Sequence, residues 1–238
     1  MIEKTSLTKR RLRTPRAAAL AGIVFAVLMI ISLVLIRISV PERLDDTAQW
    51  LGEYANRITF AIGLIPFAGI AFLWFLGVIR DRLGEYEDRF FSSVFFGSGL
   101  LFIAMTFISG ATAASLLSFY TLEPELLPQT PTYLFNRVFI FQIINVYGLR
   151  MAGVFMLSLG TIWVRTKIMP RSIVFLTYGL ALLQLLGLNL SLWYSLVFPG
   201  WVFLISVSIL IFNFRQKNTP QKIPNDDQIF PADKTLLD

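Results

Sequence analysis

The stretch AAALAGIVFAVLMIISLVLI, residues 17–36, contains twenty consecutive residues without a single charge. A helix needs roughly 20 apolar residues to cross a hydrocarbon core about 30 Å thick. The stretch is longer than the apolar part of a cleaved signal peptide, which usually has about 7–15 residues, and no convincing A-x-A site precedes the following SVPERLDD. We therefore predict that residues 17–38 form an uncleaved transmembrane helix.

Five further runs of the chain have a similar length and apolar composition. Hydrophobic residues make up 55% of the 238-residue chain and charged residues only 15%, against roughly 25% in soluble domains. We therefore predict an all-α fold, a polytopic transmembrane helical bundle over residues 17–213. Its six predicted spans are residues 17–38, 58–79, 90–119, 138–164, 172–190 and 193–212.

Lysine and arginine are distributed unequally between the loops of this bundle. If the N-terminus is cytoplasmic, the cytoplasmic segments carry 16 of these residues and the outer segments carry 4. The outer four are Arg37, Arg43, Arg57 and Arg137. Because cytoplasmic loops are enriched in positive charge, we predict a multi-pass protein of the bacterial inner membrane with both termini cytoplasmic. Residues 1–16 are then a basic cytoplasmic tail, and residues 214–238 a polar, disordered one.

The basic run KRRLRTPR, residues 9–16, contributes much of the net charge of +6. Next to a membrane surface, this run predicts contact with anionic lipid headgroups. No nucleic-acid-binding motif accompanies the charge, so we do not expect nucleic acid as a partner. The partner that the composition does predict is the lipid bilayer.

Two of the loops carry structural predictions. Residues 41–57, PERLDDTAQWLGEYANR, are expected to form a short outer helix in which Leu51 and Tyr54 share a face. Residues 120–133 contain three prolines, which predicts an extended segment.

The predicted span 138–164 contains one charged residue, Arg150, near its midpoint. Placing an arginine there costs between about 2.5 and 17 kcal/mol, so the guanidinium should face protein or water. It lies about thirteen residues from either end of the helix, too far for the side chain to reach the interface fully. All fifteen Asp and Glu residues lie in predicted loops and tails. We therefore expect polar side chains or backbone carbonyls to solvate Arg150.

Polar side chains on the same helix are the first source of such partners. Tyr147 is one turn away from Arg150, at i−3. The candidates on this helix are Gln142, Asn145 and Tyr147.

Two prolines are the second source. Pro66 and Pro199 each interrupt the hydrogen-bond ladder of another span, which frees the carbonyls of Ile62 and Ser195. We hypothesise that these two kinked helices offer carbonyls to Arg150 around a polar pocket. Two interpretations stay open: the guanidinium locks the bundle together, or it holds an anion or a lipid headgroup.

The predicted span 90–119 is rich in small and hydroxyl-bearing residues. Gly110 and Ala114, and likewise Ala111 and Ser115, are small-xxx-small pairs that let helices approach closely. We predict dense helix packing along this span, with a polar path lined by hydroxyls as the alternative.

One short motif is similar to the inner-loop motif of the major facilitator transporters, G-x-x-x-D-R-x-G. It is GVIRDRLG, residues 77–84, between the second and third predicted spans. The matching positions are Gly77, Asp81, Arg82 and Gly84. Glu85 and Tyr86 stand where that family has basic residues, and RMAGVF after Leu149 lacks its R-x-x-Q-G pattern. Six spans would be half of such a transporter.

Most of residues 17–213 resembles a group of small bacterial polytopic integral membrane proteins of uncharacterised activity. The stretches that carry this resemblance are IPFAGIAFLWFLGVIRDRLGEYEDRFF, NVYGLRMAGVF and VFPGWVFLISV. The resemblance implies a shared fold and a membrane location, but neither an activity nor any functional residue.

The chain contains no Cys and no His. This excludes disulfides, thiolate and imidazole metal sites, and catalysis that uses histidine as a base. We expect no cofactor, no metal and no enzymatic activity. The composition favours a structural or accessory membrane protein with a buried polar network around Arg150. The alternative is a small transporter or channel component for an anionic solute, whose half-transporter size would indicate a homodimer.

Overall fold

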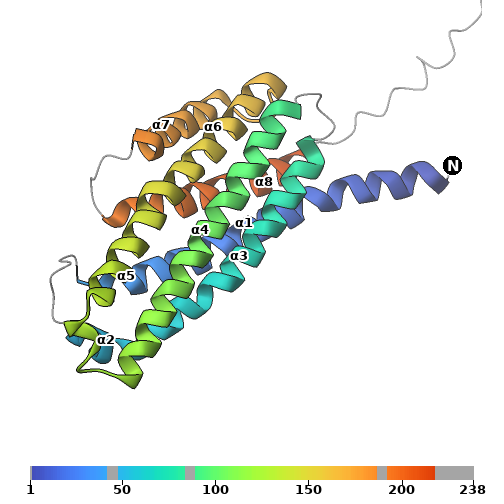
Figure 1. Cartoon of the computed structure of the whole chain (residues 1–238). Coiled ribbons are helices and arrows are strands. Elements are labelled where there is room, and N and C mark those ends of the chain that lie inside the picture. Colours follow the sequence, from blue (N-terminus) through green and yellow to red (C-terminus); the bar gives the residue numbers. More distant parts are fainter. Residues whose placement is uncertain (1, 42–47, 84–88, 187–191, 218–238) are drawn as a thin grey trace, which may run out of the picture.

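The regular structure of the described chain is helical (Figure 1). The computed structural model describes residues 2–41, 48–83, 89–186 and 192–217. For these residues the all-α prediction is confirmed. In chain order the elements are α1 (Ile2–Ser39), α2 (Gln49–Glu53), α3 (Ala55–Leu83), α4 (Arg89–Leu122), η1 (Leu127–Gln129), α5 (Pro131–Phe141), η2 (Gln142–Gly148), α6 (Leu149–Thr166), α7 (Arg171–Leu186), η3 (Leu192–Leu196) and α8 (Val197–Lys217).

The long helices pack side by side into a bundle. α1 lies against α3 and α8, and α4 lies between α3 and α6. α7 packs along α6 at one edge of the bundle, as Figure 1 shows. The helices α1, α3, α4, α6 and α8 therefore surround a common interior.

Five helical segments are long and apolar enough to cross a membrane. α7 has 16 residues, which gives it a length of about 24 Å against a hydrocarbon core of about 30 Å. The prediction of six spans is therefore corrected, for the described residues, to five candidate spans and one shorter apolar helix. Residues 187–190 of the predicted fifth span lie outside the described residues. The five candidates are Ala17–Ser39, Ala55–Asp81, Phe90–Leu122, Pro131–Thr166 and Trp193–Ile211.

The fourth candidate span is longer than predicted and is not a uniform α-helix. It has 36 residues, Pro131–Thr166, against the predicted 138–164. Proline stands at its first position, where the missing N–H costs no hydrogen bond. In its middle, η2 is a seven-residue π-helix.

α3 also extends beyond its predicted span, to Leu83. Residues 77–83 are therefore helical, because Arg and Leu propagate the helix beyond the apolar run. The loop placement that the resemblance to the major facilitator motif implied is wrong for these residues, and Gly84 lies outside the described part of the chain.

Five phenylalanines from five helices form an aromatic cluster in the interior. Phe25 (α1), Phe72 (α3), Phe102 (α4), Phe155 (α6) and Phe198 (α8) are all buried. The ring centroids of Phe102 and Phe198 lie 4.6 Å apart in an edge-on arrangement, and Phe155 meets Phe198 at 87°. Such tilted contacts align the positive ring edge with the negative ring face. The aromatic cluster therefore fixes how these five helices meet.

A second buried cluster, the α2 cap, closes one end of the bundle. Trp50 and Leu51 of α2 are buried in it, so the predicted short helix is confirmed over Gln49–Glu53. Residues 42–47 of the predicted helix lie outside the described residues. The members of the α2 cap are Ala48, Trp50, Leu51, Ile58, Leu116, Leu117, Leu127 and Tyr133.

The prediction that residues 120–133 are extended is wrong. α4 continues to Leu122, and a turn then leads into the 3₁₀ helix η1. Leu127 is 0% exposed in the α2 cap, and Thr130 Oγ1 donates to its carbonyl at 2.8 Å. Burial of this leucine outweighs the extended preference of the three prolines.

The predicted dense packing along α4 is observed at two glycines. A Cβ added to Gly99 would lie 3.1 Å from Phe155, and one added to Gly110 would lie 3.2 Å from Ile65. Neighbouring helices therefore approach α4 at these glycines. Ala111 and Ser115 are exposed, so that pair does not pack within the chain.

Candidate functional site

A cavity of about 710 Å³ lies between the aromatic cluster and the α2 cap. Its walls come from α1, α3, α4, the α5–η2–α6 helix and the η3–α8 junction. Phe102 and Met29 belong to both the cavity and the core around the aromatic cluster, whereas Trp50 and Leu51 belong to the α2 cap. The cavity therefore lies along the bundle between two packed regions and is partly open to the outside of the bundle.

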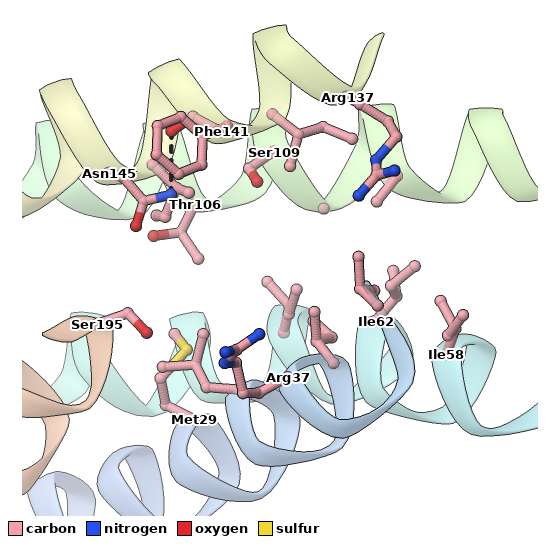
Figure 2. Close-up of a pocket in the computed structure, with 18 of the residues that line it drawn as sticks. Met29, Arg37, Ile58, Ile62, Thr106, Ser109, Arg137, Phe141, Asn145 and Ser195 are labelled. Atoms are coloured by element: carbon pink, nitrogen blue, oxygen red, sulfur yellow. Dashed lines mark hydrogen bonds between the residues drawn. The ribbon is translucent and has the colours of Figure 1, made fainter. Parts of the chain in front are cut away.

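Two arginines from opposite walls point into this cavity (Figure 2). Arg37 comes from the last turn of α1, and Arg137 comes from α5 on the facing side. None of the described residues that line the cavity is Asp or Glu. Two guanidinium groups thus face one space from helices that are far apart in sequence.

Arg137 is held by the α2 cap and the end of α1. Its side chain is only 7% exposed. Nη2 donates to the Pro41 carbonyl at 2.9 Å, and Nη1 donates to the Tyr133 hydroxyl at 3.3 Å. The guanidinium also lies over the Trp50 ring, 5.2 Å from its centroid, and Trp50 Nε1 donates to Tyr133 at 3.0 Å. These contacts fix the orientation of the planar guanidinium.

Arg37 is positioned by a cation–π contact with Trp193, a residue far from it in the sequence. Its Cζ lies 5.8 Å from the ring centroid of Trp193, which belongs to η3. A cation over an indole face is favoured by the ring quadrupole. This contact ties the end of α1 to the segment that leads into α8.

The remaining polar lining consists of hydroxyls and one amide. Three of these groups donate to a backbone carbonyl: Thr106 to Phe102 at 2.8 Å, Asn145 to Phe141 at 3.1 Å, and Tyr194 to Leu183. Figure 2 shows Thr106 and Asn145 near one end of the cavity, with Arg137 toward the other. The polar residues of the lining other than the arginines and Trp50 are Thr106, Ser109, Asn145, Tyr194 and Ser195.

The π-helix η2 forms part of the cavity wall. Ile144 and Asn145, both in η2, line the cavity, and so does Leu149 directly after it. A π-helical turn widens the helix and shifts the residues before it relative to those after it. The π-helix therefore sets the rotation of Arg137 relative to α6.

The structure brings some of the predicted pocket residues together and separates others. Asn145 and Pro199 line the cavity. Gln142 and Tyr147 are exposed, with Tyr147 at 58%. Pro66 is exposed on α3 and does not line the cavity. The predicted group is therefore divided between the cavity and the outer surface of the bundle.

Arg150 finds its partner on its own helix. Its Nη1 donates to the carbonyl of Val146, inside the π-helix, at 2.6 Å, and its side chain is half-buried. In the described part of the chain, no hydrogen bond joins Arg150 to the carbonyls of Ile62 or Ser195, where we expected its partners. Arg150 interacts electrostatically with Tyr194, which lines the cavity. It thus stands beside the cavity rather than in its lining.

Sequence reasoning missed Arg37 and Arg137 as site residues. Both lie at ends of predicted spans, where an arginine ordinarily marks the membrane interface. The available signal was the absence of acidic residues in the spans combined with aromatic residues, Trp50 and Tyr133, near the same end. That signal becomes specific only once the fold places the two arginines in one cavity.

The described residues contain no group of three or more acidic side chains that could hold a metal ion, and the chain has no Cys or His. Comparisons of the chain with protein families, with curated proteins and with solved structures found no match. The resemblance to the major facilitator motif therefore gains no support from them. The chain is a polytopic membrane protein with five candidate spans, and its cavity is the feature from which a function can be argued.

Proposed function

We propose that this membrane protein binds an anionic solute in the cavity between Arg37 and Arg137, as the binding step of a small transporter or channel component. The observation that carries the proposal is the approach of two guanidinium groups from opposite walls to one space of about 710 Å³. Known small-molecule sites have volumes of about 300–1,000 Å³ and few, well-placed polar groups. The cavity has that size and that pattern.

The charges favour an anion for a simple electrostatic reason. A cation in the low-dielectric interior of a membrane protein is costly, and charged residues there commonly mark ion or substrate sites. Arginine presents a planar fork of donors that matches carboxylate, sulfate and phosphate oxygens. Because Arg137 is already oriented by Pro41 and Trp50, an anion would lose little free energy in ordering it.

The predicted orientation gives the site a direction. If both termini are cytoplasmic, the C-terminal end of α1 and the start of α5 lie on the outer side of the membrane. The two arginines would then bind a solute that enters from outside. The proposal is for a binding protein and not an enzyme, because no side-chain set in the described cavity resembles a nucleophile with its base.

Quenching of Trp50 fluorescence tests the proposal. Trp50 lines the cavity beside Arg137, and its signal is isolated by subtracting the Trp50→Phe variant. Iodide is the anionic quencher, and acrylamide is the neutral one. Removing one contact between a guanidinium and an anion at a partly hydrated site is worth about 0.5–1 kcal/mol, a ~2–5-fold effect. We expect the iodide quenching constant to fall by that factor in Arg37→Gln and Arg137→Gln.

Two controls decide the outcome. Arg171→Gln, at the exposed start of α7, should leave iodide quenching unchanged, and acrylamide quenching should be equal in all variants. Equal iodide quenching in the native protein and in both cavity variants would contradict the proposal. It would support the other interpretation, in which the arginines only tie the helices of a structural protein together.

A further inference from the structure

The cavity is not uniformly polar along its length. Arg37 and Met29 both line it from α1, eight residues apart, which corresponds to about 12 Å along the helix. Between and opposite them the wall is apolar, with Leu33, Ile62 and Ile65. Charge is therefore concentrated toward the α2 cap, and the space continues from there toward the aromatic cluster.

Two polar side chains in the inner half of the cavity, Thr106 and Asn145, already donate hydrogen bonds within the protein. They donate to carbonyls of their own helices, at 2.8 and 3.1 Å. Both side chains are neutral and bond to the carbonyl four residues earlier in their own helices, so neither attracts an anion by charge. The strongest donors that face the cavity are the guanidinium groups of Arg37 and Arg137, because charge-assisted hydrogen bonds are roughly twice as strong as neutral ones.

We infer that the solute is an amphiphilic anion: a single carboxylate, sulfate or phosphate head joined to one apolar chain. The head lies between Arg37 and Arg137, and the chain runs past Leu33 toward Met29 and Phe102. This inference rests on the proposed function, since it names the chemical class of the ligand for the same cavity. A free fatty acid has this chemistry, and so does an anionic lipid that places its head and one of its chains in the cavity.

The orientation of the chain can be tested with two isomers, 2-bromodecanoate and 10-bromodecanoate. They have nearly the same partition into detergent or lipid, but bromine sits next to the carboxylate in one and at the chain end in the other. Bromine quenches tryptophan only at short range, and Trp50 stands beside Arg137. We expect 2-bromodecanoate to quench Trp50 and 10-bromodecanoate to leave it largely unquenched. Equal quenching by both isomers would contradict the inferred orientation.

Chain length provides a second measure. The affinity of 2-bromo acids should rise by about 3–4-fold per methylene from propanoate to hexanoate, since each buried CH₂ contributes a hydrophobic term. Ser109→Leu fills the middle of the cavity and should weaken 2-bromodecanoate at least as much as two methylenes strengthen it, while iodide still quenches Trp50. Ser115→Leu, at an exposed position of the same helix, is the matched control.

These experiments separate the failure of this inference from the failure of the proposed function. If iodide quenching depends on the two arginines but the affinity for 2-bromo acids does not rise with chain length, the site binds anions but the ligand is not an amphiphile. If neither iodide quenching nor the affinity for 2-bromo acids depends on Arg37 or Arg137, the proposed function and the inferred ligand class are both wrong. Repeating the titration in nanodiscs of anionic or zwitterionic lipid identifies the source. If 2-bromodecanoate binds more weakly only in the anionic nanodiscs, the anionic lipid competes for the site and is the ligand. If it binds equally in both kinds of nanodisc, the ligand is a free acid.

Discussion

Arg137 donates a hydrogen bond to the backbone carbonyl of Pro41 at 2.9 Å, although the two residues are 96 positions apart. The bond joins the middle of α5 to Pro41, two residues after the end of α1. It crosses the end of the cavity that is next to the α2 cap, so one side chain both faces the cavity and holds its walls.

Replacing Arg137 with Lys should therefore lower stability. Lysine keeps the charge but cannot keep the bonds to Pro41 and Tyr133 together with the planar contact on Trp50. We expect a loss of about 1–3 kcal/mol, as for other buried charge-assisted hydrogen bonds, measured by thermal unfolding of the protein in detergent. Arg171→Lys, at an exposed position, should unfold like the native protein.

Arg150→Gln should have a smaller effect, although Arg150 has the more central position in its span. It loses one described bond, to Val146, at a half-buried site. We expect a loss of about 1 kcal/mol and unchanged iodide quenching of Trp50. If quenching fell as far as in Arg137→Gln, Arg150 would belong to the binding site itself.

We expect that replacing the buried Gln184 with leucine stabilises the protein. It is 0% exposed in α7, and among the described residues neither its amide oxygen nor its amide nitrogen has a hydrogen-bond partner. A buried unsatisfied amide costs about 1–3 kcal/mol, so Gln184→Leu should raise the unfolding temperature. A destabilised Gln184→Leu would show that the amide has a partner in the functional protein. Gln142→Leu, at an exposed position, is the comparison.

Gly22 marks a close approach between α1 and α8. A Cβ there would overlap Ser206 Oγ and lie 2.8 Å from the Phe75 ring. We expect Gly22→Ala to destabilise by about 1–3 kcal/mol, as overpacking does, and Ser206→Ala to restore part of the loss. At Gly63 a Cβ meets nothing within 4 Å, so Gly63→Ala should be neutral or stabilising by up to about 1 kcal/mol.

Trp201 and Thr177 form a buried pair between α8 and α7. Trp201 Nε1 donates to Thr177 Oγ1 at 2.9 Å. Thr177→Val leaves the indole N–H without this acceptor, which should cost about 1–3 kcal/mol. In a Trp201→Phe background the same change should cost much less, because no donor remains. Equal costs in both backgrounds, measured by unfolding, would show that the bond does not contribute to stability.

The apolar runs predicted the membrane-spanning helices well, because the thickness of a bilayer sets the length of a span independently of tertiary contacts. The ends of the helices were predicted less well. α3 continues to Leu83 and the fourth span begins at Pro131, since helix propensity and proline at the first position act outside the apolar run. α7 ends its described part at Leu186, too short for the span expected there.

The candidate site was harder to predict, for a geometric reason. Arg150 was chosen because it stands alone in the middle of a span, but the π-helix supplies the Val146 carbonyl as its partner. The sequence pattern of residues 142–148 does not predict a π-helix. Arg37 and Arg137 face the same cavity only because α1 and α5 pack around the α2 cap. This spatial relationship cannot be read from one sequence.

The aromatic cluster has a consequence for permeation. The rings of Phe72, Phe102, Phe155 and Phe198 pack against one another at the end of the cavity that Phe102 lines, and the ring centroids of Phe102 and Phe198 are only 4.6 Å apart. Rings at this separation leave no room for a water molecule between Phe102 and Phe198. Any solute that moved from the cavity through this layer would therefore first have to separate these rings.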